Sequence, residues 1–280
     1  TTTLELICSE TNFLSAPMKN VYARLAALLT VFLIATSSAF ATHVSGGDFS
    51  ITCLGNNEYL VNLSLYRDCS GVNMLNTENI DITSSCGNQL NVTLNLLNVG
   101  GTEISQLCPS VIDSSTCAGG FGTLPGVELY IYQATVTLAD CDDWLFAWTT
   151  GNRNTTVNVP TSLFDQITII AELNTLDAPC NSSPIFTAQP IPYVCNNQQT
   201  TYNYGVYEPD GDSLTFSLVP ALDGNATQPL IYAATYSATN PIQGIVIDPL
   251  TGAITFTPTI TGNFIVAMQV NEYDPVTGVF

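Results

Sequence analysis

The sequence predicts an all-β protein, in which an antiparallel, disulfide-stapled β domain is followed by an Ig-like or cadherin-like β-sandwich. Three observations predict this class. Apolar and polar residues alternate with a period of two in many short segments, turn-forming residues recur between these segments, and an even number of cysteines follows a secretory leader. No comparable stretch after the leader shows a convincing helical period of 3.6 residues.

A signal peptide is predicted at residues 18–41. Lys19 and Arg24 precede an apolar run at residues 25–35, and small residues of the A-x-A type end at Ala41. The run is shorter than the roughly 20 apolar residues that span a bilayer, so we expect no membrane insertion after cleavage. A buried core helix is the alternative, but the basic flank and the small-residue exit favour export. Residues 1–17 contain no Met and are expected to be an upstream segment without a structural role.

The first predicted domain covers residues 42–183. It opens with a hairpin, because two alternating segments flank the turn-forming residues Gly55-Asn56-Asn57. Further segments of period two follow in order, at residues 80–82, 90–96, 130–138, 144–148 and 167–173. A period of two places one face in a core and the other in water, which is typical of antiparallel sheets.

The second predicted domain covers residues 184–280. Turn formers and prolines cluster at residues 178–184, which indicates a boundary. Short alternating segments then recur at residues 202–206, 214–218, 254–256 and 264–270, with Asp-Gly and Thr-Gly turns between them. Such spacing is typical of an Ig-like sandwich. Residues 274–280 indicate a turn and the start of another strand, so we expect the sandwich to be truncated at its C-terminal end.

The cysteine count favours disulfide bonds. Cys8 precedes the leader and eight cysteines follow it, and an even number in an exported chain indicates a disulfide framework. A zinc cluster is the alternative, but the chain has no C-x-x-C pair and a single His. Eight cysteines allow about a hundred pairings. Proximity along the chain favours three pairs, which are Cys108–Cys117, Cys180–Cys195 and Cys69–Cys86.

The charge balance excludes two classes of partner. The chain has 23 acidic and 4 basic residues and a net charge of −19. Binding to nucleic acid requires Lys and Arg to neutralise phosphates, and binding to anionic lipid requires the same side chains. The chain is nevertheless not an acidic disordered tail, because 46% of its residues are hydrophobic. The balance suits an extracellular protein that stays soluble through self-repulsion.

Catalytic motifs are sparse, and no enzymatic activity is predicted. A triad needs a His, and the only one is His43, at the expected start of the mature chain, where an N-terminal copper or nickel site is a minor alternative. The densest acidic cluster, Asp140, Asp142 and Asp143, precedes an aromatic strand that contains Trp144 and Trp148. Stacking of these rings on a sugar is one interpretation. A buried strand after a turn is the favoured one, since the rings share one face.

Calcium binding is the main site hypothesis. Glu208, Asp210 and Asp212 alternate around Gly211, and a second pair of acids ends a later strand at Glu272 and Asp274. A calcium ion takes roughly six to eight oxygen ligands, mostly from carboxylates and backbone carbonyls. The alternative is a plain tight turn, in which Asp and Gly are favoured anyway.

Several motifs carry a family resemblance. Residues 207–218 (YEPDGDSLTFSL) and 247–259 (IDPLTGAITFTPT) resemble cadherin-like and putative Ig domains, adjacent to PKD domains, of bacterial surface proteins. Blocks at residues 42–48, 65–69 and 178–184 resemble the N-terminal region of large secreted surface proteins of gliding-type bacteria. The resemblance implies export by the type IX secretion route, a cell-surface location, and calcium at the same acidic residues.

Two functions are therefore expected from the sequence. The first is a non-enzymatic, exported surface protein with an adhesive or structural role, whose partner is an extracellular protein or polysaccharide. The alternative is the carbohydrate-binding N-terminal region of a secreted enzyme that acts on polysaccharides. Exposed, coplanar rings at Trp144 and Trp148 favour the alternative, and their burial favours the first function.

Overall fold

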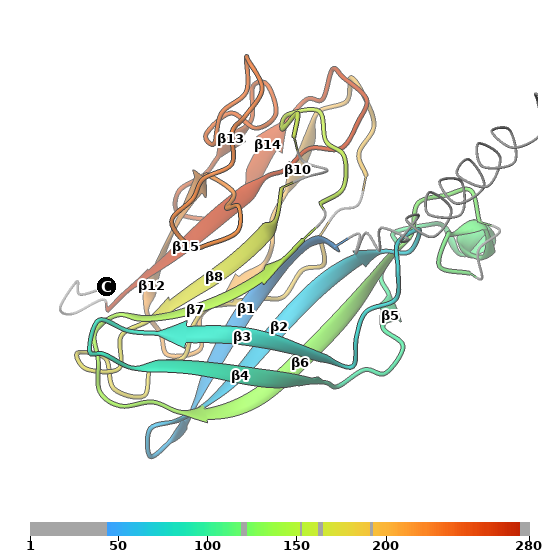
Figure 1. Ribbon diagram of the computed structural model, residues 1–280. Helices are drawn as coiled ribbons and strands as arrows, with labels where there is room; N and C mark the ends of the chain where they lie inside the picture. The colour runs from blue at the N-terminus through green and yellow to red at the C-terminus, as the bar shows by residue number, and fades with distance from the viewer. Residues whose placement is uncertain (1–43, 119–121, 152, 162–164, 191–192, 275–280) are drawn as a thin grey trace, which may run out of the picture. The chain divides into compact units, whose positions relative to one another are not determined.

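The first half of the chain forms one antiparallel sheet of eight strands (Figure 1). The computed structural model describes residues 44–118, 122–151, 153–161, 165–190 and 193–274. The strand order is β1-β2-β6-β4-β3-β7-β8, and β5 pairs with β6 beside this path. The strands are β1 Val44–Gly55, β2 Glu58–Asp68, β3 Thr77–Thr83, β4 Gln89–Leu96, β5 Thr102–Glu103, β6 Val127–Thr137, β7 Trp144–Thr150 and β8 Ile167–Leu173.

The predicted hairpin at residues 55–57 is confirmed. Gly55 of β1 pairs with Glu58 of β2, so Asn56 and Asn57 form a two-residue loop. Both asparagines have positive φ angles, 53° and 62°. A type I′ turn requires this conformation at both central positions, and Asn tolerates it better than most residues.

The sheet folds over on itself around one core. Figure 1 shows β3 and β4 crossing over β1 and β2, and Ile51, Leu63 and Ile82 from these strands belong to the same buried cluster. The two ends of the strand order also meet, because β1 contacts β8. The alternation of buried and less buried residues along β2 shows the period of two that the sequence predicts.

Three disulfides staple the described part of the chain, but none joins the cysteines that proximity along the chain favoured. The pairs are Cys53–Cys180, Cys69–Cys117 and Cys86–Cys141. Cys108 and Cys195 are unpaired and exposed. The expected pairs Cys108–Cys117, Cys180–Cys195 and Cys69–Cys86 are therefore wrong. Antiparallel pairing of distant strands brings distant cysteines together, and sequence spacing does not report it.

The second half consists of short strands in three small antiparallel sheets. β10 and β13 flank β14, β11 pairs with β9, and β12 pairs with β15. A 3₁₀ helix, η1 Pro109–Ser114, lies in the first half, and the described residues contain no α-helix. The strands are β9 Ile185–Phe186, β10 Thr200–Tyr202, β11 Val206–Tyr207, β12 Ser213–Val219, β13 Val246–Ile247, β14 Ile254–Phe256 and β15 Ala267–Tyr273.

One predicted strand is divided in the structure. The alternation at residues 202–206 predicts a single strand, whereas β10 and β11 belong to different sheets. Gly205 separates them, with a φ of 61° that L residues with a side chain rarely adopt. A Cβ at this position would also lie 2.7 Å from the Thr187 hydroxyl oxygen. The backbone therefore turns where the side-chain pattern alone suggests continuity.

The segment predicted as a domain boundary packs against β1. The Ser183 N–H donates to the Ile51 carbonyl at 2.8 Å, and the Ile51 N–H donates to the Ser183 hydroxyl at 2.8 Å. All described residues belong to a single compact unit. The division at residues 183 and 184 stays a prediction. The signal peptide and the upstream segment lie outside the described residues.

The all-β, antiparallel and disulfide-stapled class is confirmed by these sheets and bridges. Three disulfides in one chain are typical of proteins that fold in an oxidising environment. The described residues hold no apolar helix of membrane-spanning length.

Candidate metal centre

A tight acidic loop follows β11, and the Glu208 side chain folds back in it to accept hydrogen bonds from the backbone of the next residues. The Glu208 carboxylate accepts the N–H groups of Asp210 at 3.0 Å and Asp212 at 2.7 Å, and also that of Gly211. Gly211 has a φ of 93°, which only Gly adopts readily and which closes the loop. These contacts fix the carboxylate of Glu208 next to that of Asp212.

Strand pairing brings a third carboxylate to this loop. β12 begins directly after Asp212, and Leu214 of β12 lies opposite Glu272 of β15. Carboxylate oxygens of Glu208, Asp212 and Glu272 all lie within 4.8 Å of one another, and the three residues are partly buried. Sequence reasoning singled out these acids separately, and the antiparallel register of β12 and β15 joins them.

The other two acids of the sequence hypothesis are not in this group. Asp210 is exposed and turns to the segment before β9, where its carboxylate accepts the Ser182 N–H at 2.6 Å. Asp274 interacts with Asp212 through its charge, but its carboxylate is not one of the three that converge. The structure therefore assembles three of the five predicted ligands.

Asn181 is a neighbour of the centre that sequence reasoning missed. Its side-chain amide donates a hydrogen bond to Glu272. Asn181 follows Cys180, whose disulfide to Cys53 anchors this segment on β1. No local pattern indicates this contact, because it depends on a disulfide between residues that are distant in the sequence.

The three carboxylates repel one another, and no basic side chain is among the groups that act on Asp212 or Glu272. Partial burial, followed by repulsion from Glu208 and Asp212, raises the pKa of Glu272 from its ordinary 4.5 to about 7. Desolvation, followed by repulsion from Glu208, also raises the pKa of Asp212. A hydrogen bond joins Asp212 and Glu272, so the cluster binds a proton more readily than isolated carboxylates do.

Both basic side chains among the described residues are used elsewhere. Arg67 is 6% exposed and forms an ion pair with Glu128 at 2.6 Å. Arg153 is 7% exposed and donates to the backbone carbonyls of Gln166 and Leu222. Neither arginine supplies charge to the acidic cluster.

In the second acidic cluster, Asp140, Asp142 and Asp143, two carboxylates are held by hydrogen bonds to other parts of the fold. The Asp143 carboxylate accepts the Ser85 N–H at 3.0 Å, and Asp140 accepts the Asn57 side-chain amide at 3.3 Å. Asp142 and Asp143 lie near the sulfurs of Cys86 and Cys141. These sulfurs form a disulfide, so they offer no thiolate to a metal.

The aromatic strand β7 is buried. Trp144 is 1% exposed and Trp148 is 2% exposed, and Phe146 packs in the same core. The indole N–H of Trp144 donates to the Ala139 carbonyl at 2.9 Å, and that of Trp148 donates to Glu78 at 3.0 Å. The rings therefore present no surface on which a sugar can stack, which confirms the buried-strand interpretation.

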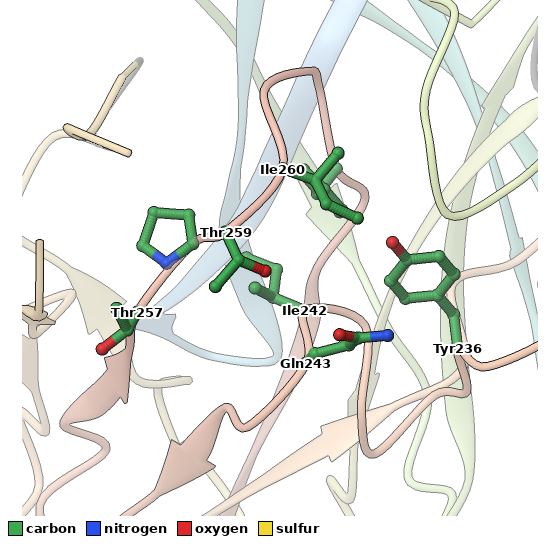
Figure 2. Close-up of a pocket in the computed structure, with 8 residues that line it drawn as sticks. Tyr236, Ile242, Gln243, Thr257, Thr259 and Ile260 are labelled. Atoms are coloured by element: carbon green, nitrogen blue, oxygen red, sulfur yellow. The ribbon is translucent and has the colours of Figure 1, made fainter. Parts of the chain in front are cut away.

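A shallow hollow in the second half carries no reactive group. Figure 2 shows Tyr236, Gln243 and Ile260 around it, and its open space is about 210 Å³, including solvent. Its lining contains aliphatic, aromatic and uncharged polar side chains, without an acid, a base or a cysteine. His43, the alternative copper or nickel ligand, lies outside the described residues.

Comparison with known protein families, curated proteins and solved structures finds no match for the chain. The resemblance to surface proteins of gliding-type bacteria therefore stays a prediction.

Proposed function

We propose that this chain is an exported, non-enzymatic module with a structural or adhesive role at the cell surface, stabilised by one calcium ion. The observation that carries the proposal is the convergence of Glu208, Asp212 and Glu272 within 4.8 Å. Carboxylate oxygens are the ligands that calcium prefers, and water and backbone carbonyls complete its coordination. The disulfide framework supports an extracellular location, and the leader at residues 18–41 supports export.

The electrostatic state of the cluster favours a bound cation. The pKa of Glu272 is raised to about 7, first by the partial burial of its carboxyl and then by repulsion from Glu208 and Asp212. A divalent cation removes that repulsion and displaces the proton. Because β11, β12 and β15 supply or position the ligands, the ion ties three strands of the second half together.

The acidic surface and the buried β7 rings narrow the class of partner that we propose. The burial of Trp144 and Trp148 removes the stacking surface on which the alternative, the carbohydrate-binding region of a secreted enzyme, depends. The acidic surface, with both described arginines buried, disfavours nucleic acid and anionic lipid. The proposed partner is an extracellular protein or polysaccharide, and the proposed export path after the leader is the type IX route.

Thermal unfolding with calcium and with chelator tests the calcium site. At a calcium concentration of about 100 times the dissociation constant, binding stabilises the native state by about 2.7 kcal/mol. We expect this gain at pH 8 and a smaller one at pH 5, because the proton on Glu272 competes with the ion. Matched ionic strength from NaCl separates site binding from screening of the net charge.

The variant Glu272→Gln sharpens this test. An amide mimics the protonated carboxyl, so the variant should be more stable than the wild type in chelator at pH 8 and should lose the calcium response. Glu172→Gln, at an exposed position on β8, is the matched control and should retain the response. An unchanged midpoint of wild-type unfolding with calcium at pH 8 would show that no calcium site exists.

A further inference from the structure

Two exposed cysteines lie outside all strands of the described chain. Cys108 precedes the 3₁₀ helix η1 as its N-cap residue, and Cys195 lies between β9 and β10. No ladder of strand hydrogen bonds holds either residue in place. They belong to opposite halves of the chain, so a link between them would join the two halves.

Tyr193 connects the segments that carry these cysteines. Its hydroxyl donates a hydrogen bond to the Pro125 carbonyl at 2.6 Å and also contacts the Ser105 side chain. Ser105 in turn lies 3.9 Å from the sulfur of Cys117, which is held by its disulfide to Cys69. The anchor point of Tyr193 is therefore a covalently stapled part of the first half.

Each cysteine is close along the chain to one of the two residues that meet in this contact. Cys195 is two residues from Tyr193, a span of at most about 7 Å, and Cys108 is three residues from Ser105, at most about 10 Å. The chain also folds back after Ser105, since the Leu107 N–H donates to the Ser105 carbonyl. A disulfide needs a Cα–Cα distance of about 4.4–6.8 Å, so a bond between Cys108 and Cys195 requires these two short, irregular segments to adjust to that distance.

We propose that Cys108 and Cys195 form a fourth disulfide, which locks the β9–β10 connection onto the loop that carries η1. Formation removes two protons and two electrons from the thiols. A disulfide-bearing thiol oxidant, of the kind found in oxidising compartments, accepts the electrons through a mixed disulfide and is reduced to its dithiol. Exposure of both thiols gives the oxidant access.

This bond would be a second covalent anchor for the segment that contacts the candidate metal centre. Cys53–Cys180 already anchors one end of the segment that contains Asn181 and Ser182, which contact Glu272 and Asp210. A bond at Cys195 anchors the other end. The segment is then held at both ends while it contacts the acidic loop.

The distribution of basic residues makes a simple test of this pairing. Trypsin cleaves after Lys and Arg, and the only such sites after the leader are Arg67 and Arg153. Cleavage at both sites gives three fragments. The first ends at residue 67, the middle fragment covers residues 68–153, and the last covers residues 154–280. Cys69–Cys117 and Cys86–Cys141 lie within the middle fragment, and Cys53–Cys180 joins the outer two. Only a bond from Cys108 to Cys195 attaches the middle fragment without changing these three pairs.

The experiment digests the full chain, produced in an oxidising compartment, after unfolding and alkylation without reductant. We expect one species with the mass of all three fragments of a single chain, which separates into three when reductant is added. A middle fragment released with an alkylated cysteine would overturn the proposal. A species with the mass of two chains would also overturn it, by showing that the thiols pair between copies.

Two variants assign the bond to its cysteines. Cys108→Ser and Cys195→Ser should each release the middle fragment without reductant, and each should leave one alkylated cysteine. Retention of the middle fragment in either variant would contradict the pairing. The wild-type digest needs no folded variant, so the proposal is tested even where a substitution impairs folding.

Discussion

At the scale of single residues, the contact between β1 and β8 depends on the absence of one side chain. Gly47 lies on β1, and a Cβ built there would lie 2.4 Å from the Ser64 carbonyl oxygen and 2.7 Å from the Ile169 Cδ1 atom. Ile169 belongs to β8, the far end of the strand order. Gly47 therefore lets the two ends of the sheet approach each other.

Gly47→Ala should lower the free energy of unfolding by about 1–3 kcal/mol, because overpacking forces the backbone and Ile169 to shift. Denaturant unfolding measures the change. Gly46→Ala is the neighbouring control, since a Cβ at Gly46 meets no atom within 4 Å. Equal effects of the two substitutions would contradict the close approach of β1 and β8.

At the scale of elements, a half-buried carboxyl lies where β1 contacts the second half. Asp48 of β1 accepts the Tyr66 hydroxyl at 2.7 Å and also bonds Ser64, both from β2. Tyr204, near β10, faces the same carboxyl, and β1 contacts β9 directly. Burial raises the pKa of Asp48 from 3.8 to about 6, against the lowering effect of its two hydrogen bonds.

This raised pKa predicts a pH dependence of stability. The native state binds the Asp48 proton more tightly than the unfolded state, so stability contributed by this group is lost as the pH rises from about 4 through 6. Asp48→Asn should remove that loss and gain about 1–3 kcal/mol at pH 8 relative to the wild type. Unfolding at several pH values checks this, with Asp81→Asn, at an exposed site on β3, as the control. A destabilised Asp48→Asn protein at pH 8 would contradict the prediction.

At the scale of the whole molecule, the basic side chains of the described residues are all interior. The described residues contain no Lys, and both arginines, Arg67 and Arg153, are buried and hydrogen-bonded. The surface of the described part therefore carries carboxylates without basic side chains between them. Such a surface repels copies of itself and favours cations as partners.

Trypsin under native conditions should therefore report global unfolding. Cleavage after Arg67 and Arg153 requires their exposure, so we expect it to be slower than in the unfolded chain by a factor of about a thousand or more. Mass spectrometry of timed digests measures the rate, and a protease that cuts after exposed aromatic residues such as Tyr207 is the control. Rapid native cleavage at Arg67 would show that β2 is not held as described.

The local sequence patterns were sufficient to predict the class of fold and the positions of most strands. Alternation along residues 58–68 and 144–148 indicates buried faces because neighbouring side chains of a strand point to opposite sides. The same reasoning placed Trp144 and Trp148 in the core. It failed at Gly205, where a positive φ turns the chain although the alternation continues.

The disulfide pairs and the metal centre required the arrangement of the strands in space. Cys53 meets Cys180, and Glu208 meets Glu272, because the strand order and the register of β12 and β15 join segments that are far apart in the chain. Hydrophobic alternation fixes which face of a strand is buried, but not which strand lies beside it. The eight cysteines thus predicted a framework, and only the folded sheets define its partners.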